Sequence, residues 1–292
     1  MTGTVALRVG EVDVVRVIER HTLTPPDFLP AAVGGALDRH ASWLQPWALT
    51  AEGQLRFVLS ALCLKYGGRK VVVDTCVGPR ALPGDYSGLA DDGTFLDDLT
   101  AAGFGPDDVD VVINTHLHFD HVGWNTRPTD GAWVPTFGRA RYLASRPEYE
   151  AWQAETVERR ESANVFNLAD ALDPLLAAGL LDLVEPVHRV DDTLAFVPTP
   201  GHSPGHFSVA ITSGEERALI TGDCAHHPVQ LVEPDWHSVA DHDPALAGAT
   251  RSWVRDTFTD SGVLLIGTHF PPPGAGRLVH EGGTVRFRLL DR

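Results

Sequence analysis

The stretch that decides the fold is Val109-Asp-Val-Val-Ile-Asn-Thr-His-Leu-His-Phe-Asp-His-Val-Gly-Trp-Asn125. Its β-branched run, Val111 to Ile113, is typical of a short buried strand. Four side chains that can bind a metal follow it within six positions: His116, His118, Asp120 and His121. Because a strand ends in a fixed direction, the turn that leaves it can bring these side chains toward one point. Imidazoles and a carboxylate suit Zn²⁺, with Mn²⁺ or Fe²⁺ as alternatives.

Three further candidate ligands lie far along the chain, and each closes an apolar run with the composition of a strand. They are His202, Asp223 and His269, which follow the runs Leu194–Val197, Ala218–Ile220 and Val263–Ile266. Ligands at the ends of four separate strands favour a metal site at one edge of a sheet. His206, close to His202, is expected to support that loop through hydrogen bonds and is not counted as a ligand.

In this order of motifs the sequence resembles the metallo-β-lactamase-fold hydrolases, whose signature is His-x-His-x-Asp-His followed by a distant His, Asp and His. The similarity covers roughly residues 55 to 285, and all seven family ligands find a match. The resemblance implies an α+β fold, the αββα four-layer sandwich of two mixed β-sheets with helices on the outside. Groups of strands with helices between them, twice along the chain, fit that class.

The same resemblance divides the ligands between two metals. It implies one metal on His116, His118 and His202, a second on Asp120, His121 and His269, and Asp223 as the bridge. The implied activity is that of a dinuclear zinc hydrolase that uses a hydroxide bridging the two metals, with Asp120 also catalytic as a proton carrier. Asp74 is expected to accept a hydrogen bond from a metal-bound imidazole; the alternative is a carboxylate that caps a turn.

Substrate choice has to come from residues around the metals. His226 stands where acyl-homoserine-lactone lactonases carry a Tyr that helps to hold the substrate carbonyl. The runs His226–Gln230 and Thr268–Pro271 look more like the methyl-parathion-hydrolase-like branch, which includes lactone and aryl-ester hydrolases, whereas Phe119 matches the lactonases. We expect His226 to be catalytic as a contact to the carbonyl or phosphoryl oxygen, and the alternative is a solvated loop histidine.

The expected substrate is a small molecule, a lactone or carboxylic ester with an apolar moiety. Two alternatives stay open at this point. One is a phosphotriester hydrolase that uses the same site, because both reactions pass through an anionic centre between two metals. The other is a metal-containing binding protein without turnover.

Length and composition predict one domain over residues 1–292, because 292 residues with 43% apolar content can bury one large core. Residues 1–50 are expected to be an N-terminal extension. Its segment Pro25–Thr50 is interrupted by prolines and glycines and loaded with aromatic residues such as Phe28, Trp43 and Trp47. The segment either fastens to the core, caps the metal site or forms a contact in a homodimer.

The formal net charge of −16 argues against nucleic acid and anionic membranes as partners. The sequence contains no apolar run long enough to cross a bilayer and no signal-peptide pattern at its start, so we expect a cytoplasmic protein. The three cysteines are an odd number in apolar surroundings, which predicts buried thiols rather than disulfides.

Two helix starts are marked clearly. Ser145-Arg-Pro-Glu148 has the pattern of a capping box, and Asp243-Pro244 places an N-cap before a proline in the first turn. Strand pairs are expected within residues 4–18 and 55–74, each turning at glycines.

Overall fold

The computed structural model describes residues 4–82, 88–90, 93–158 and 168–290. The chain divides into two compact units, one made of Met1–Arg20 with Leu59–Pro186, the other of His21–Val58 with Val187–Arg292. Residues 1–50 are therefore shared between the units. The single domain expected from the sequence stays a prediction, as does a role for the N-terminal extension in capping the site or in a dimer.

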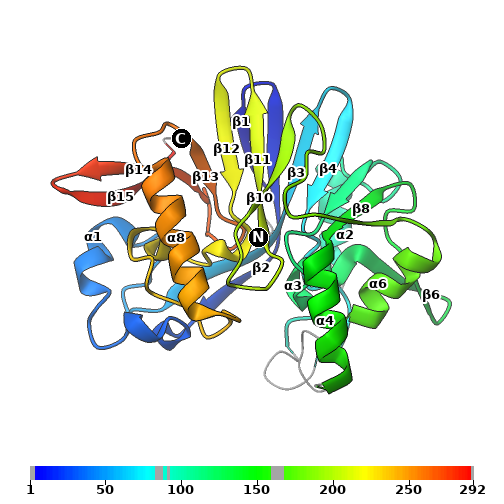
Figure 1. Cartoon of the computed structure of the whole chain (residues 1–292), viewed down its shortest axis with the longest axis horizontal. Helices are drawn as coiled ribbons and strands as arrows, with labels where there is room; N and C mark the ends of the chain where they lie inside the picture. The colour runs from blue at the N-terminus through cyan, green and yellow to red at the C-terminus, as the bar shows by residue number, and fades with distance from the viewer. Residues whose placement is uncertain (1–3, 83–87, 91–92, 159–167, 291–292) are drawn as a thin grey trace. The chain divides into compact units, whose positions relative to one another are not determined.

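A seven-stranded mixed sheet has the order β1-β2-β3-β4-β5-β8-β9 (Figure 1). Its strands are β1 Val5–Val9, β2 Val12–Thr24, β3 Leu55–Tyr66, β4 Arg69–Val73, β5 Val111–Ile113, β8 Arg141–Ser145 and β9 Leu181–Val184. The two hairpins, β1–β2 and β3–β4, form as predicted. Strands β4, β5, β8 and β9 run parallel. All three residues of β5 are buried, which explains its continuous apolar run.

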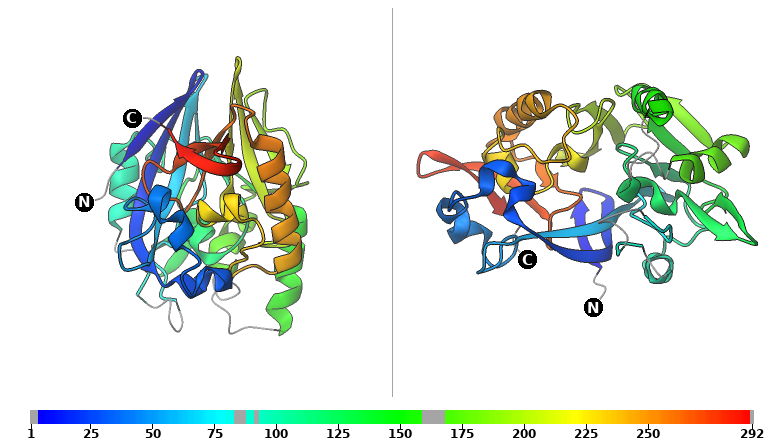
Figure 2. Two further views of the ribbon diagram at one scale, coloured as in Figure 1. Left: turned by 90° about the vertical axis from the view of Figure 1, so that its left-hand side faces the viewer. Right: turned by 90° about the horizontal axis from the view of Figure 1, so that it is seen from below.

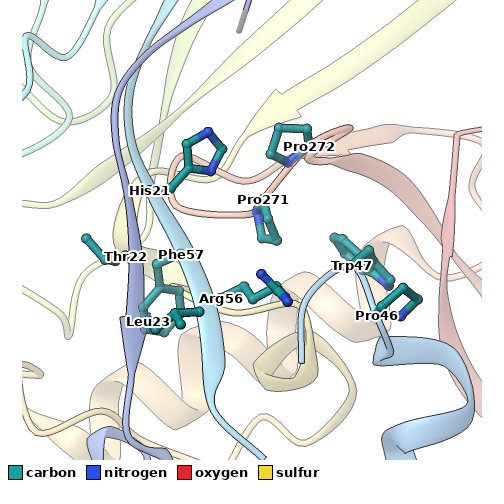
Figure 3. A pocket seen from close by; sticks show the side chains of 9 residues that line it. All are labelled: His21, Thr22, Leu23, Pro46, Trp47, Arg56, Phe57, Pro271 and Pro272. Carbon is teal, nitrogen blue, oxygen red and sulfur yellow. The ribbon is translucent and has the colours of Figure 1, made fainter. Parts of the chain in front are cut away.

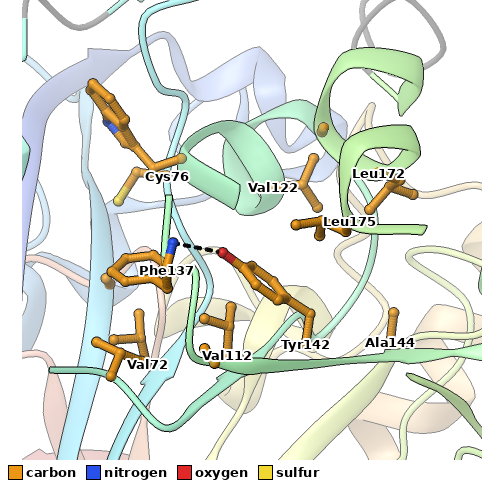
Figure 4. Close-up of a cluster of buried hydrophobic side chains, with 14 of the residues drawn as sticks. Val72, Cys76, Val112, Val122, Phe137, Tyr142, Ala144, Leu172 and Leu175 are labelled. Atoms are coloured by element: carbon orange, nitrogen blue, oxygen red, sulfur yellow. Dashed lines mark hydrogen bonds between the residues drawn. The ribbon is translucent and has the colours of Figure 1, made fainter. Parts of the chain in front are cut away.

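Helices and a small hairpin accompany this sheet in the described part of the first unit. They are α2 Thr94–Ala101, α3 Phe119–Val122, α4 Arg146–Glu158, α6 Leu168–Ala177 and the strands β6 Thr126–Thr129 and β7 Ala132–Pro135. The core on which they pack is largely apolar and includes the buried phenol of Tyr142 (Figure 4). That hydroxyl accepts a hydrogen bond from the Phe137 N–H and donates one to the Asn125 carbonyl, both at 3.0 Å. The buried polar group is thus satisfied, as burial requires.

A six-stranded mixed sheet forms the second unit, with its strands in chain order. The strands are β10 Leu194–Pro198, β11 Phe207–Ser213, β12 Glu216–Ile220, β13 Leu264–Ile266, β14 Ala275–Glu281 and β15 Thr284–Leu289, and the helices are α7 Val229–Val232 and α8 Pro244–Phe258. Helix α8, orange in Figures 1 and 2, runs alongside this sheet. It begins as predicted, because the Asp243 carboxylate accepts a hydrogen bond from Leu246 N at 3.0 Å.

Residues 25–50 form short turns of helix, η1 Pro26–Phe28, η2 Pro30–Ala32, η3 Asp38–His40 and α1 Ala41–Leu44. Their apolar side chains pack with Val229 and Trp236 in one buried cluster. Trp47 stacks on Phe287, with ring centroids 6.2 Å apart. The reading that this segment fastens to a core is therefore confirmed within its own unit.

All three cysteines are buried free thiols, as predicted. None of the helices in the described residues combines the length and the apolar character that crossing a bilayer requires.

Candidate metal centre

The first group of predicted ligands leaves β5 in the first unit. Asn114 N donates to the Leu143 carbonyl at 3.0 Å, so the chain stays attached to the sheet one residue beyond the strand. The ring of His116 then lies 4.5 Å from that of His118 and 4.0 Å from that of His121. The structure thus gathers the three imidazoles, and Asp120 Oδ2 lies 3.7 Å from His121 Nε2.

The Asp74 carboxylate supports the ligand loop through hydrogen bonds. Its Oδ2 accepts from His121 Nδ1 at 2.9 Å, and its Oδ1 accepts from Thr115 N at 2.8 Å. The residue has φ 61°, a left-handed conformation that is uncommon outside glycine. With the proton of His121 on Nδ1, its Nε2 keeps a lone pair for a metal. The hydrogen bond expected of Asp74 is confirmed.

Helix α4 also supports the ligand loop, which the sequence did not indicate. Ser145 Oγ accepts from Glu148 N at 3.4 Å, as the capping pattern predicted. The buried Glu148 carboxylate also bonds to the ligand loop and to its own helix: its Oε1 accepts hydrogen bonds from Leu117 N at 3.2 Å and from Trp152 Nε1 at 2.7 Å. The Trp152 ring lies 5.4 Å from that of His118. One carboxylate therefore fixes both the backbone of the loop and the aromatic wall behind it.

The second group of predicted ligands lies in the second unit, at the ends of neighbouring strands. Strands β12 and β13 are parallel, so Asp223 and His269 leave the same edge of the sheet. The Nε2 atoms of three histidines lie near the Asp223 carboxylate: His269 at 3.1 Å, His226 at 3.2 Å and His202 at 3.5 Å. This convergence of imidazole nitrogens on one carboxylate is the chemistry of a divalent-cation site.

The other ring nitrogens of the two histidine ligands in this unit are hydrogen-bonded to oxygens. His269 Nδ1 donates to the Val58 carbonyl at 2.9 Å, and His202 Nδ1 donates to Asp241 Oδ1 at 3.2 Å. Both acceptors place the proton on Nδ1 and leave Nε2 unprotonated. Burial lowers the pKa of His202, which keeps its imidazole neutral at pH 7. The residues present therefore fit a metal on chemical grounds.

Asp241 is a support that sequence reasoning missed. Its Oδ2 accepts from Arg251 Nη1 at 3.1 Å and from Ser238 N at 3.0 Å. Burial alone would raise the pKa of this carboxyl, but the hydrogen bond to His202 and the nearby positive charges hold the pKa well below its ordinary value. Asp241 lies 39 positions after His202, and no spacing rule links them.

His206 links two parts of the second unit, as expected. Its Nδ1 lies 2.9 Å from both the hydroxyl and the carbonyl oxygen of Thr199, and its Nε2 accepts from Asp223 N at 2.9 Å. Both ring nitrogens are used in holding the backbone around the ligands.

His226 is 5% exposed, so the alternative of a solvated loop histidine is wrong. Its ring lies 5.2 Å from that of Phe28 and 4.7 Å from that of His202. It is nearly parallel to the ring of His269, at 11°. Its Nδ1 is buried without a hydrogen-bond partner among the described residues. Phe28 belongs to the aromatic N-terminal segment, which therefore contributes to the surroundings of this histidine.

The family model described as the metallo-beta-lactamase superfamily matches residues 58–269. An N-acyl homoserine lactonase of Bacillus thuringiensis is 29% identical over 232 residues, which cover 75% of this chain and 82% of the relative. The N-acyl homoserine lactonase AttM of Rhizobium radiobacter is 29% identical over 179 residues, covering 55% and 62%.

Solved structures match over the whole chain. The hydrolase AbOPH of the beta lactamase superfamily gives a TM-score of 0.81 at 22% identity, covering 100% of this chain and 99% of that one. AidC, a dizinc quorum-quenching lactonase, gives 0.78 at 21% identity, covering 100% and 98%. At these identities the likeness concerns the fold, and it confirms the fold class expected from the sequence, with its two mixed sheets and helices.

Proposed function

Because the chain belongs to the metallo-β-lactamase superfamily and is a metal-dependent hydrolase of that family, we propose that it hydrolyses a lactone or carboxylic ester with an apolar moiety. In the second unit, the Nε2 atoms of two proposed ligands, His202 and His269, lie within 3.5 Å of the carboxylate of a third, Asp223, and this arrangement carries the proposal. Together these side chains form a preorganised cation site, in a chain whose curated relatives include N-acyl homoserine lactonases.

Two divalent cations, zinc before Mn²⁺ or Fe²⁺, are proposed to bind the two groups of side chains described above. The ligands proposed are His116, His118, Asp120, His121, His202, Asp223 and His269. The support is the order of motifs together with the hydrogen bonds that hold Nδ1 of His121, His202 and His269 on oxygens. When bound, such a pair of cations lowers the pKa of water toward about 7 and polarises a carbonyl oxygen.

The remaining chemistry is assigned to two side chains. Asp120, whose side chain is 16% exposed, is proposed to carry a proton to the leaving oxygen of the substrate. His226 is proposed to donate a hydrogen bond to the substrate carbonyl from its ring. The packing of that ring against Phe28 and His202 would fix the direction of the donor, so little reorganisation would be needed during the reaction.

Phosphotriester hydrolysis is the second candidate. A histidine at position 226, where the resembling lactonases carry Tyr, favours it, since an imidazole can also contact a phosphoryl oxygen. We place it second because a curated relative that covers 75% of this chain is an N-acyl homoserine lactonase.

A substrate panel with metal analysis tests the proposal. Purified protein would be assayed with lactones of increasing acyl length, aryl esters, phosphotriesters and β-lactams, and its zinc, manganese and iron measured. We expect kcat/KM for the best lactone or ester to exceed that for any phosphotriester by at least about tenfold, with activity lost on chelation. Efficient phosphotriester turnover with inert lactones and esters would replace the first candidate by the second. Full metal occupancy without hydrolysis of any activated ester would show a binding protein.

A further inference from the structure

The second unit contains a pocket of about 370 Å³ beside β3 (Figure 3). Its walls are largely apolar and include Trp47, Phe57 and Pro271. Figure 3 shows the side chain of Arg56 extending from the strand toward Trp47 and Pro271, on the side of the strand opposite to Phe57. Of the residues that line the pocket, Arg56 is the one with a permanent charge. The volume is that of a small-molecule site.

The Arg56 guanidinium has no hydrogen bond or ion pair with any described residue, and its Nε is buried. The nearest titratable groups do not neutralise it. Glu52 is fully exposed, its carboxylate bonds to its own backbone and to Thr50, and the charge of Arg56 is the smallest of the causes that lower its pKa. Burial, assisted by the charge of Arg56, lowers the pKa of His21, so this second basic group of the wall is neutral at pH 7. An unpaired cation persists here in a chain with a net charge of −16.

Contacts outside the pocket fix the side chains of Trp47 and Phe57. The Trp47 indole N–H donates to the Trp43 carbonyl at 2.7 Å, and its ring stacks on Phe287. The Phe57 ring packs edge-on against those of Phe28 and His227, at 5.4 and 5.8 Å. Because these contacts fix the rings without a ligand, binding would cost little ordering.

We propose that this pocket binds a small organic carboxylate with a flat apolar body, whose carboxylate pairs with the Arg56 guanidinium. An apolar body alone would not use the guanidinium, and a small inorganic anion would leave the aromatic walls uncovered. A carboxylate can accept two parallel hydrogen bonds from one guanidinium, which is the geometry that suits arginine best. The site is separate in its chemistry from the proposed hydrolysis, and it does not depend on that activity.

The test compares 1-naphthaleneacetate with its neutral amide, 1-naphthaleneacetamide, by calorimetric titration of the full chain. We expect the acid to bind about tenfold or more tightly than the amide, as charge-assisted hydrogen bonds allow. Arg56→Gln should remove this preference by weakening the acid and leaving the amide unchanged, and Arg56→Lys should retain part of it. Arg277→Gln is the matched control, because Arg277 is exposed in the same unit and donates to Gly262 O outside the pocket.

Parallel titrations after chelation separate this site from carboxylate binding to a metal, since only binding at Arg56 survives removal of metals. Inorganic phosphate should compete at least tenfold less well than the naphthalene acid. Equal binding of acid and amide, no binding of either, or unchanged acid binding by folded Arg56→Gln would each overturn the proposal. If Arg56→Gln does not fold, acid binding by Arg56→Lys equal to that of the original chain would overturn it.

Discussion

The Asp223 carboxylate lies within 3.5 Å of three imidazole Nε2 atoms. The replacement Asp223→Asn removes its negative charge, which would reduce the repulsion between two bound cations. We expect bound metal to fall by about one equivalent and kcat/KM by about 100-fold or more. Mutation of a residue that only hydrogen-bonds to a metal ligand already lowers metal affinity or activity by about 10–100-fold. Elemental analysis and kinetics measure both. Asp192→Asn, at a fully exposed site in the same unit, is the control. Unchanged stoichiometry would remove Asp223 from the ligand set.

His226 is buried against the ligands without being assigned as one. The change His226→Phe keeps an aromatic ring against Phe28 but removes both ring nitrogens. We expect kcat/KM to fall by about 100-fold, the usual loss for a donor to a developing oxyanion, while metal content stays constant. A loss of metal would identify His226 as a ligand, and unaltered kinetics would exclude contact with the substrate.

Asp241 positions His202 and at the same time compensates the charge of Arg251. In Asp241→Asn, metal affinity should weaken about 10–100-fold because the His202 tautomer is no longer fixed. Stability should fall by about 3 kcal/mol, because Arg251 is left buried without its anion. Chelator competition and urea unfolding measure the two effects.

The double variant Asp241→Asn with Arg251→Met separates the effect on metal affinity from the effect on stability. Removal of the uncompensated guanidinium should restore part of the stability, whereas metal affinity should remain low. Recovery of metal affinity together with stability would assign Asp241 a purely structural role.

At the scale of elements, the ligand loop after β5 depends on a close approach of two backbones. Gly123 N donates to the Cys76 carbonyl at 2.8 Å, and a Cβ on Gly123 would lie 1.8 Å from the Val77 carbonyl oxygen. Gly123→Ala should therefore push α3 and its ligands away from residues 76–78. We expect a loss of about 3 kcal/mol in the free energy of unfolding, at the upper end for overpacking.

Gly138→Ala provides the comparison, because a Cβ there meets open space. It should change stability by less than about 1 kcal/mol. Equal urea midpoints for the two variants would contradict the tight packing inferred for Gly123.

For the whole molecule, stability should decrease in mild acid. His227 is buried, its Nε2–H donates to the Ala48 carbonyl, and its Nδ1 accepts from Val229 N. Burial lowers its pKa to about 4 from an ordinary 6.5. The unfolded chain therefore binds a proton between pH 6.5 and 4 that the folded chain does not. The neutral His227 side chain therefore contributes up to about 3 kcal/mol to the free energy of unfolding above pH 6.5, and this contribution is lost as the pH falls toward 4.

Urea unfolding at pH 7.5, 6.0 and 5.0 in the presence of a chelator measures this dependence. His227→Gln should be less stable at pH 7.5 but show a shallower decline with acid. His280→Gln, at an exposed position, should decline like the original chain. If the free energy of unfolding falls equally with acid in His227→Gln and in the original chain, His227 is not the group responsible for the acid dependence.

Local patterns in the sequence predicted most elements, because strand composition, glycine turns and helix caps act over a few residues. The strands β5 and β12 and the start of α8 follow from such patterns. The ligand positions also stood out, since metal chemistry restricts residue type and spacing. Whether the two groups of ligands share two metals is still a proposal.

Partners distant along the chain were decided by tertiary structure alone. The Val58 carbonyl accepts a hydrogen bond from His269, 211 positions away, and Asp241 reaches His202 from the loop before α8. The burial of His226 and the unpaired Arg56 depend likewise on what packs around them. A sequence restricts which residue types can bind a metal, but the hydrogen bonds that orient them and the walls of a pocket exist only once remote segments are packed together.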